Sequence, residues 1–212
     1  MIIEKFFNKW IMFFLILIPT CGVIFDEPYF ITLATKVVIL GIAGIGLNLA
    51  LGYCGLISFG HAAFFGLGGY VTGILSFHAL SSEIMLSWPF VTSGSSDMLV
   101  IWPIVILSSA FLALIIGLLS LRTTGVYFIM ITLAFAQMLY FFAISWPNYG
   151  GEDGLSIYMR NSLPMINTMD PLTFYFICLC WLLIVIFISA KLINSSFGMA
   201  FQAIKQLSLI HI

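Results

Sequence analysis

The residues best suited to a chemical role lie in an uncharged stretch, residues 52–61, that joins two strongly apolar segments. Its glycines permit positive φ angles and close backbone contacts. Non-helical backbone at membrane depth is tolerated only where protein buries it or a water-filled cavity adjoins it. We therefore expect a broken or re-entrant segment beside a translocation path, with an ordinary tight turn at the cytoplasmic surface as the alternative. The candidate residues are Gly52, Gly55, Ser58, Gly60 and His61.

Two further polar side chains, Asn48 and Gln137, lie inside apolar stretches. Such residues usually hydrogen-bond across helices, and a minority line a path. His61 could relay a proton, but none of the apolar stretches carries Asp or Glu in its interior. Carriers coupled to protons or sodium commonly use intramembrane carboxylates, so the sequence argues against a carrier of that kind.

No motif in the chain indicates an enzyme. A G-x-x-x-x-G-K-[ST] phosphate-binding loop is absent from the sequence, so the chain conducts passively or takes its energy from a partner. The cysteines show neither a C-x-x-C pair nor the His/Cys spacing of a metal site. We expect no cofactor and no metal in this chain, and no nucleic-acid partner. The four cysteines are Cys21, Cys54, Cys178 and Cys180.

Glycines also recur in the apolar stretch that follows His61. Gly69 and Gly73 form a small-xxx-small pair, which lets another helix approach closely. We interpret Gly66, Gly69 and Gly73 as helix-packing residues in preference to solute contacts.

The elements that position these residues belong in a membrane. Of the 212 residues, 62% are hydrophobic and only 7% are charged, against roughly 25% charged in soluble domains. Each of six apolar segments is close to the ~20 residues that a helix needs to cross a ~30 Å hydrocarbon core. We predict an all-α polytopic membrane protein with about six transmembrane helices and a Gly-rich broken or re-entrant segment. The predicted spans are residues 6–25, 31–51, 62–80, 98–121, 124–146 and 172–190.

The charged residues predict the orientation of these spans. The first span resembles a signal peptide because Lys5 and Lys9 come before its apolar run, but Pro19 interrupts the run and we expect a retained helix. With six spans and a cytoplasmic N-terminus, the basic residues gather on the inner side and the acidic residues in the outer loops, as the positive-inside rule requires. Lys36 lies near the outer end of its span and can snorkel. The inner basic residues are Lys5, Lys9, Arg122, Lys191 and Lys205.

A last candidate site follows the sixth span, in residues 195–205. Ser195 or Ser196 can cap a helix start, and Ala200, Ala203 and Ile204 then share one helical face. A short cytoplasmic helix of this kind could dock in a partner's groove; a loop end lying on the membrane interface is the alternative. The candidate docking residues are Gly198, Ala200, Ala203, Ile204 and Lys205.

Three blocks of sequence resemble the permease subunits of branched-chain amino acid ABC importers, specifically the M-type subunit. The first block comprises residues 46–49 and 52–66, running G-L-N-L and G-Y-C-G-L-I-S-F-G-H-A-A-F-F-G. The second comprises residues 121–138 and 150–156, and it is the block more specific to the M-type subunit. The third comprises residues 196–205, which are similar to the start of the helix that docks on an ATPase subunit.

The resemblance implies a bacterial inner-membrane subunit that moves leucine, isoleucine or valine with energy from ATP. Its partners would be a second permease subunit, two ATP-binding subunits that hold ATP and magnesium, and a periplasmic substrate-binding protein, besides membrane lipid. Similar permeases move urea, amides or aromatic acids, and an ATP-independent channel is the alternative from another class. Residues 1–206 are expected to form a single permease domain, incomplete relative to the family, and residues 207–212 an unrelated tail.

Overall fold

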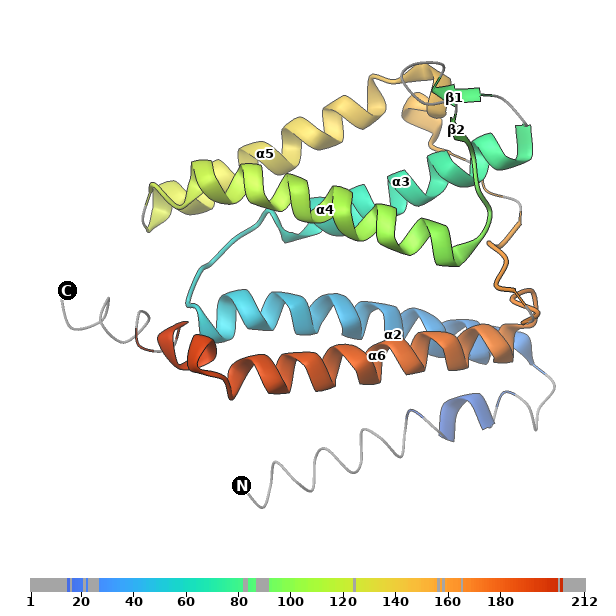
Figure 1. The fold of residues 1–212 in the computed structure, drawn as a ribbon, viewed down its shortest axis with the longest axis horizontal. Coiled ribbons are helices and arrows are strands. Elements are labelled where there is room, and N and C mark those ends of the chain that lie inside the picture. Colours follow the sequence, from blue (N-terminus) through green and yellow to red (C-terminus); the bar gives the residue numbers. More distant parts are fainter. Residues whose placement is uncertain are drawn as a thin grey trace. The chain divides into compact units, whose positions relative to one another are not determined.

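The fold is described from a computed structural model, drawn in Figure 1. The structure describes residues 15, 17–20, 22, 27–81, 84–86, 92–123, 125–155, 157, 159–164, 166–201 and 203. The predicted first span, residues 6–25, falls largely outside these residues. So do Ile204, Lys205 and the predicted tail at 207–212.

Helices dominate the described part of the chain. Five of them are long and apolar enough to cross a membrane, and they coincide with the last five predicted spans. The prediction of an all-α polytopic membrane protein is confirmed, with one short antiparallel strand pair, β1 (Ile84–Leu86) and β2 (Thr92–Ser93), as an addition. The named helices are α2 (Pro28–Asn48), η1 (Leu49–Tyr53), α3 (His61–Ser81), α4 (Met98–Ser120), α5 (Val126–Ile144), η2 (Pro147–Tyr149), η3 (Gly151–Asp153) and α6 (Pro171–Ile193).

The chain divides into two compact units. Unit 1 comprises Met1–Cys54 and Asn167–Ile212, and unit 2 comprises Gly55–Ile166. The boundary between the two units lies between residues 54 and 55, inside the uncharged stretch. Residues 52–54 of the candidate site therefore belong to unit 1, and residues 55–61 belong to unit 2.

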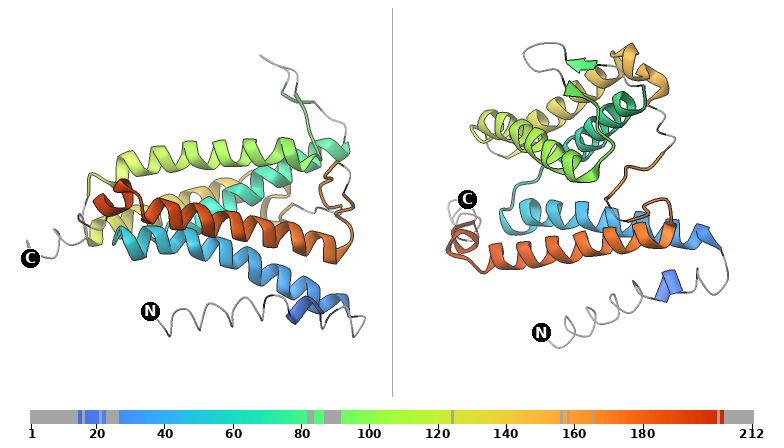
Figure 2. Two further views of the ribbon diagram at one scale, coloured as in Figure 1. Left: turned by 60° about the horizontal axis from the view of Figure 1, so that its bottom comes forward. Right: turned by 45° about the vertical axis from the view of Figure 1, so that its right-hand side comes forward.

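Unit 1 is built on the packing of α2 along α6, which run side by side in Figures 1 and 2. The contact face of α2 carries Ile31, Ala34 and Val38, spaced three and four residues apart as one face of a helix requires. Tyr175 of α6 is 1% exposed, and its hydroxyl donates a hydrogen bond to the carbonyl of Leu15. This bond satisfies a polar group that would be costly to bury alone.

Unit 2 gathers α4 and α5 around α3 (Figure 2). A Cβ on Gly68 of α3 would lie 3.3 Å from Cγ1 of Val105 on α4, so Gly68 lets these two helices pack a few tenths of an ångström closer than a larger residue would. The C-terminal half of α3 is the most deeply buried stretch of this unit.

That half of α3 is covered by the loop over residues 147–166, which touches it at three levels. Leu155 lies over Gly73. The Ser76 hydroxyl donates to Oδ1 of Asn161 at 2.7 Å, and Nε2 of His78 lies 3.0 Å from the hydroxyl of Tyr149.

The contact between His78 and Tyr149 is one of the contacts that hold this loop on α3. His78 is buried, and its Nδ1 has no hydrogen-bond partner among the described residues. A Tyr149→Phe substitution would leave the whole imidazole without a partner, at a cost of about 1–3 kcal/mol. We expect amides of residues 147–166 to exchange with deuterium about tenfold faster, which corresponds to about 1.4 kcal/mol. Tyr140→Phe, at an exposed position on α5, is the matched control. Equal exchange in Tyr149→Phe and the control would show that the loop does not depend on this bond.

Candidate functional site

The predicted break between two helices is present at residues 49–60. Helix α2 continues into the π-helical turn Leu49–Tyr53 and ends at Cys54, whose N–H donates to the Leu49 carbonyl at 3.3 Å. Residues 55–60 are not helical, and α3 begins at His61. Gly55 adopts a φ of 72°, a left-handed conformation that other residues rarely take. The prediction that residues 52–61 do not form a plain helix is confirmed.

Local hydrogen bonds satisfy part of this irregular backbone. The Ser58 hydroxyl accepts a hydrogen bond from the N–H of Gly60 at 3.1 Å, and the Gly60 carbonyl accepts one from Ala63 at 3.0 Å. Ser58 therefore closes a local turn just before the start of α3, a hydrogen-bonding pattern that serine favours outside helices.

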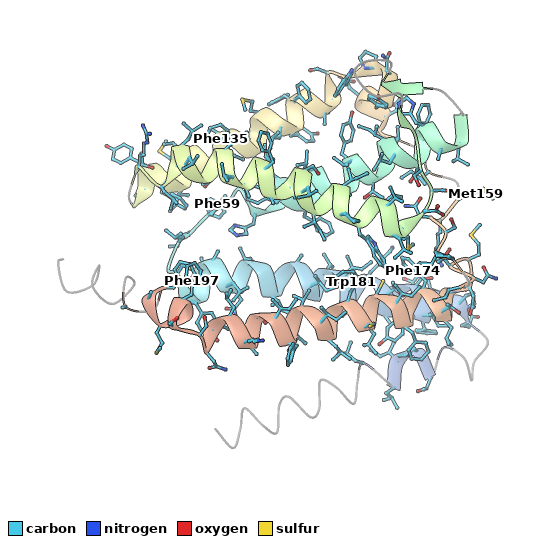
Figure 3. The ribbon with its side chains drawn as sticks, in the orientation of Figure 1. Phe59, Phe135, Met159, Phe174, Trp181 and Phe197 are labelled. Atoms are coloured by element: carbon cyan, nitrogen blue, oxygen red, sulfur yellow. The ribbon has the colours of Figure 1, made fainter. Side chains whose placement is uncertain are left out.

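The break is buried only in part, although non-helical backbone at membrane depth is tolerated only where protein buries it or a cavity adjoins it. Gly60 is buried, and a Cβ there would lie 3.0 Å from the carbonyl oxygen of Thr132 on α5. By contrast, Leu56, Ile57 and Phe59 are exposed, Phe59 by 61% (Figure 3). Only Gly60, at the end of the segment, is therefore packed in the interior of unit 2. The large apolar side chains that precede it are left exposed.

The polar candidate residues are in two different surroundings. The side chain of Asn48 lies over Gly52 in the next turn, with its Cγ 3.3 Å from where a Cβ on Gly52 would stand. His61 contacts Phe64 edge-on at 6.1 Å between ring centroids, and its Nδ1 is buried without a hydrogen-bond partner among the described residues. Gln137 is exposed on α5. The structure brings Asn48 and Gly52 together within unit 1, and it places His61 and Gln137 in unit 2.

The glycines of α3 have different neighbours from those expected. Gly66 and Gly69 have open space beside them, and Gly73 is covered by Leu155 of a loop instead of by a helix. The helix that approaches α3 within unit 2 does so at Gly68, which sequence reasoning missed. The pattern of small residues could not separate Gly68 from Gly69, because adjacent glycines point to different faces. A packing role for Gly66 and Gly69 stays a prediction.

The candidate docking segment begins with a capped helical turn. Residues 196–201 and 203 are helical, and the Ser195 hydroxyl accepts a hydrogen bond from the N–H of Gly198 at 3.3 Å. Ala200 and Ala203 are exposed, so the small side chains expected to meet a partner are uncovered. Phe197 and Phe201 pack edge to face, with ring centroids 4.4 Å apart; Phe197 is labelled in Figure 3.

An apolar cavity joins this helix to the π-helical turn inside unit 1. Its volume is about 240 Å³, enough for a bulky apolar side chain. Burial raises the pKa of the Cys54 thiol, so this group stays protonated and behaves as a small apolar part of the wall. The cavity is lined by Gly46, Leu49, Ala50, Tyr53, Cys54, Leu192, Ile193, Gly198 and Phe201.

Gly198 is the residue that allows the C-terminal helix to turn so tightly after α6. It is buried, and a Cβ there would press on the carbonyl group of Ile193 and lie 2.6 Å from the Leu192 carbonyl oxygen. We expect Gly198→Ala to displace the helix at 196–203 while the α2–α6 pair stays folded. Crosslinking between cysteines placed at Ala50 and Phe201, across the cavity, should fall several-fold. Gly117→Ala, at a position with open space, is the control, and unchanged crosslinking in Gly198→Ala would contradict the role given to Gly198.

Comparison with known proteins identifies the family of the chain. The family described as branched-chain amino acid transport system / permease component matches residues 29–207, a range that holds the break, the cavity and the C-terminal helix. No curated protein and no solved structure matches the chain. Since the match covers well over half of the sequence, the chain belongs to the family of permease components of branched-chain amino acid transport systems.

Proposed function

We propose that this chain is a permease subunit of an ATP-driven importer that moves leucine, isoleucine and valine across the bacterial inner membrane. The observation that carries the proposal is the family match over residues 29–207, which covers a helical break at 49–60 and a capped helix at 196–203. A translocation path and a docking site for an energy source are the two features that such a subunit needs.

The break provides the polar backbone that a solute path requires. Continuous apolar helix offers a zwitterionic amino acid no hydrogen-bonding groups, because its backbone bonds are internal. Residues 55–60 are not helical, and their peptide groups, with the Ser58 hydroxyl, are proposed to replace part of the water that the solute gives up. Asn48 and Gly52 are proposed to contribute polar groups as well. Alternating access between this chain and a second permease subunit would expose these groups to either side. Gly55, Gly60, His61 and Gln137 are proposed to border the same path.

The energy for inward movement would come from two ATP-binding subunits, which hold the ATP and magnesium. The sequence has no phosphate-binding loop of its own. The exposed face of the C-terminal helix, with Ala200 and Ala203, presents small side chains around which an ATPase groove can close. Ile204 and Lys205 are proposed to extend this face. Docking there requires residues 196–205 on the cytoplasmic side of the membrane. The distribution of Lys and Arg supports this orientation, in which the N-terminus is proposed to lie on the same side.

A periplasmic substrate-binding protein would deliver the solute at the opposite face. Much of the choice between solutes lies in that partner, so this chain needs to provide a path compatible with amino acids of similar size.

The test of this function is uptake by the assembled transporter. The chain is produced together with a second permease subunit, the ATP-binding subunits and the binding protein, and entry of labelled leucine is measured with and without ATP. Ala203→Glu places a charge on the docking face, and we expect it to lower both uptake and recovery of the ATP-binding subunits at least tenfold. Ala203→Ser keeps a small side chain and should retain both activities.

Three outcomes would contradict the proposal. Equal uptake without ATP would indicate a passive channel. Competition by urea, short amides or aromatic acids in place of isoleucine and valine would indicate a related permease for another solute. Full uptake and full subunit recovery in Ala203→Glu would remove the docking role of this helix.

A further inference from the structure

Lys36 is the only Asp, Glu, Lys or Arg inside the five described membrane spans, apart from Lys191 in the last turn of α6. It lies eight residues after Pro28, so its Cα is about 12 Å along α2 from the start of the helix. The span Pro28–Tyr53 has 26 residues and a length of about 39 Å, against a hydrocarbon core of ~30 Å. If the span is centred, the Cα of Lys36 lies roughly 8 Å inside the apolar layer.

The side chain of Lys36 is on the uncovered side of α2. Its neighbours Ala34 and Val38 are buried in the contact with α6, whereas Lys36 itself is exposed. An ammonium group in hydrocarbon needs an anion or water, and intramembrane ionisable residues are functional candidates for that reason. The α6 contact offers Lys36 no such group, because the face that meets α6 is on the other side of the helix.

The direction of the side chain indicates where the anion is. Each Cα–Cβ bond in an α-helix tilts toward the N-terminus, so Lys36 leans along α2 toward Tyr29. Tyr29 is seven residues earlier, nearly in line with Lys36 on the helix surface, and is 67% exposed. Tyrosine is enriched at the level of lipid headgroups. A lysine stem that rises toward an interfacial tyrosine brings its ammonium to the inner edge of the headgroup layer.

The apolar residues on the same side of α2 favour a lipid over a soluble ligand. Leu33 and Leu40 flank Lys36 within one turn, and they are 44% and 65% exposed. Side chains of this kind suit acyl chains, and an amino acid in transit would gain little from them.

We propose that Lys36 and Tyr29 form a binding site for the phosphodiester of an anionic membrane lipid, with Leu33 and Leu40 against its acyl chains. Lys36 supplies the positive charge, for which lysine is a common phosphate partner, and the Tyr29 hydroxyl donates a hydrogen bond to a phosphate oxygen. The lipid holds the N-terminal end of α2 at a fixed depth. This site does not depend on which solute the transporter moves.

Native mass spectrometry of the detergent-purified protein tests this site. Phosphatidylglycerol and phosphatidylcholine with identical acyl chains are added separately, and the fraction of protein that carries one lipid is compared. We expect the wild type to prefer phosphatidylglycerol at least fivefold, Lys36→Met to bind the two lipids equally, and Lys36→Arg to keep the preference. Tyr29→Phe should reduce the preference in part.

The controls separate a defined site from general charge attraction and from a solute site. Lys191→Met removes a lysine near the other end of the membrane and should keep the preference. If it loses as much as Lys36→Met, the lipid is held by net charge and the proposal is wrong. An undiminished preference in a folded Lys36→Met or Lys36→Gln protein overturns it as well. So does displacement of the lipid by millimolar leucine, which would assign Lys36 to a solute carboxylate.

Discussion

The arrangement of the chain depends on one constraint, which is that a peptide backbone in hydrocarbon must satisfy its own polar groups. The five spans in the described part of the chain meet most of this requirement internally. The segment between α2 and α3 does not, since residues 55–60 leave the helix. The π-helical turn, the Ser58–Gly60 bond and the entry of Gly60 beside Thr132 each reduce the cost of the break, and the division between the two units falls within it.

The cavity in unit 1 connects the break to the C-terminal helix. One wall comes from the π-helical turn and the other from the end of α6 and the following helix. Two sites that are about 150 residues apart in sequence therefore share one apolar space, and they are the sites proposed for solute passage and for ATPase docking. Packed interiors respond to small changes in volume. Movement of the C-terminal helix would therefore displace residues 49–54, which form the other wall of this cavity.

Much of the fold could be predicted from the sequence because its signals are local. Apolar length identified the described spans, the glycines and missing charge at 52–61 located the break, and a hydroxyl at Ser195 indicated the cap that the structure shows. The contacts that escaped prediction join residues far apart in the chain. Nothing local pairs His78 with Tyr149 or Ser76 with Asn161, and the choice of Gly68 for the α4 contact depends on how that helix is rotated. The exposure of Leu56, Ile57 and Phe59 likewise depends on tertiary packing.

The break is proposed to border the path of the solute. The most direct test is the reactivity of a cysteine at Ser58, in a chain whose four native cysteines are alanine and which is assembled with its partners. A small, charged thiol reagent that requires water should modify this cysteine, and saturating leucine should slow the reaction several-fold. A cysteine at Leu107, exposed on α4, should not react. If the cysteine at position 58 is as unreactive as the one at 107, or if leucine leaves its rate unchanged, the break does not border the path.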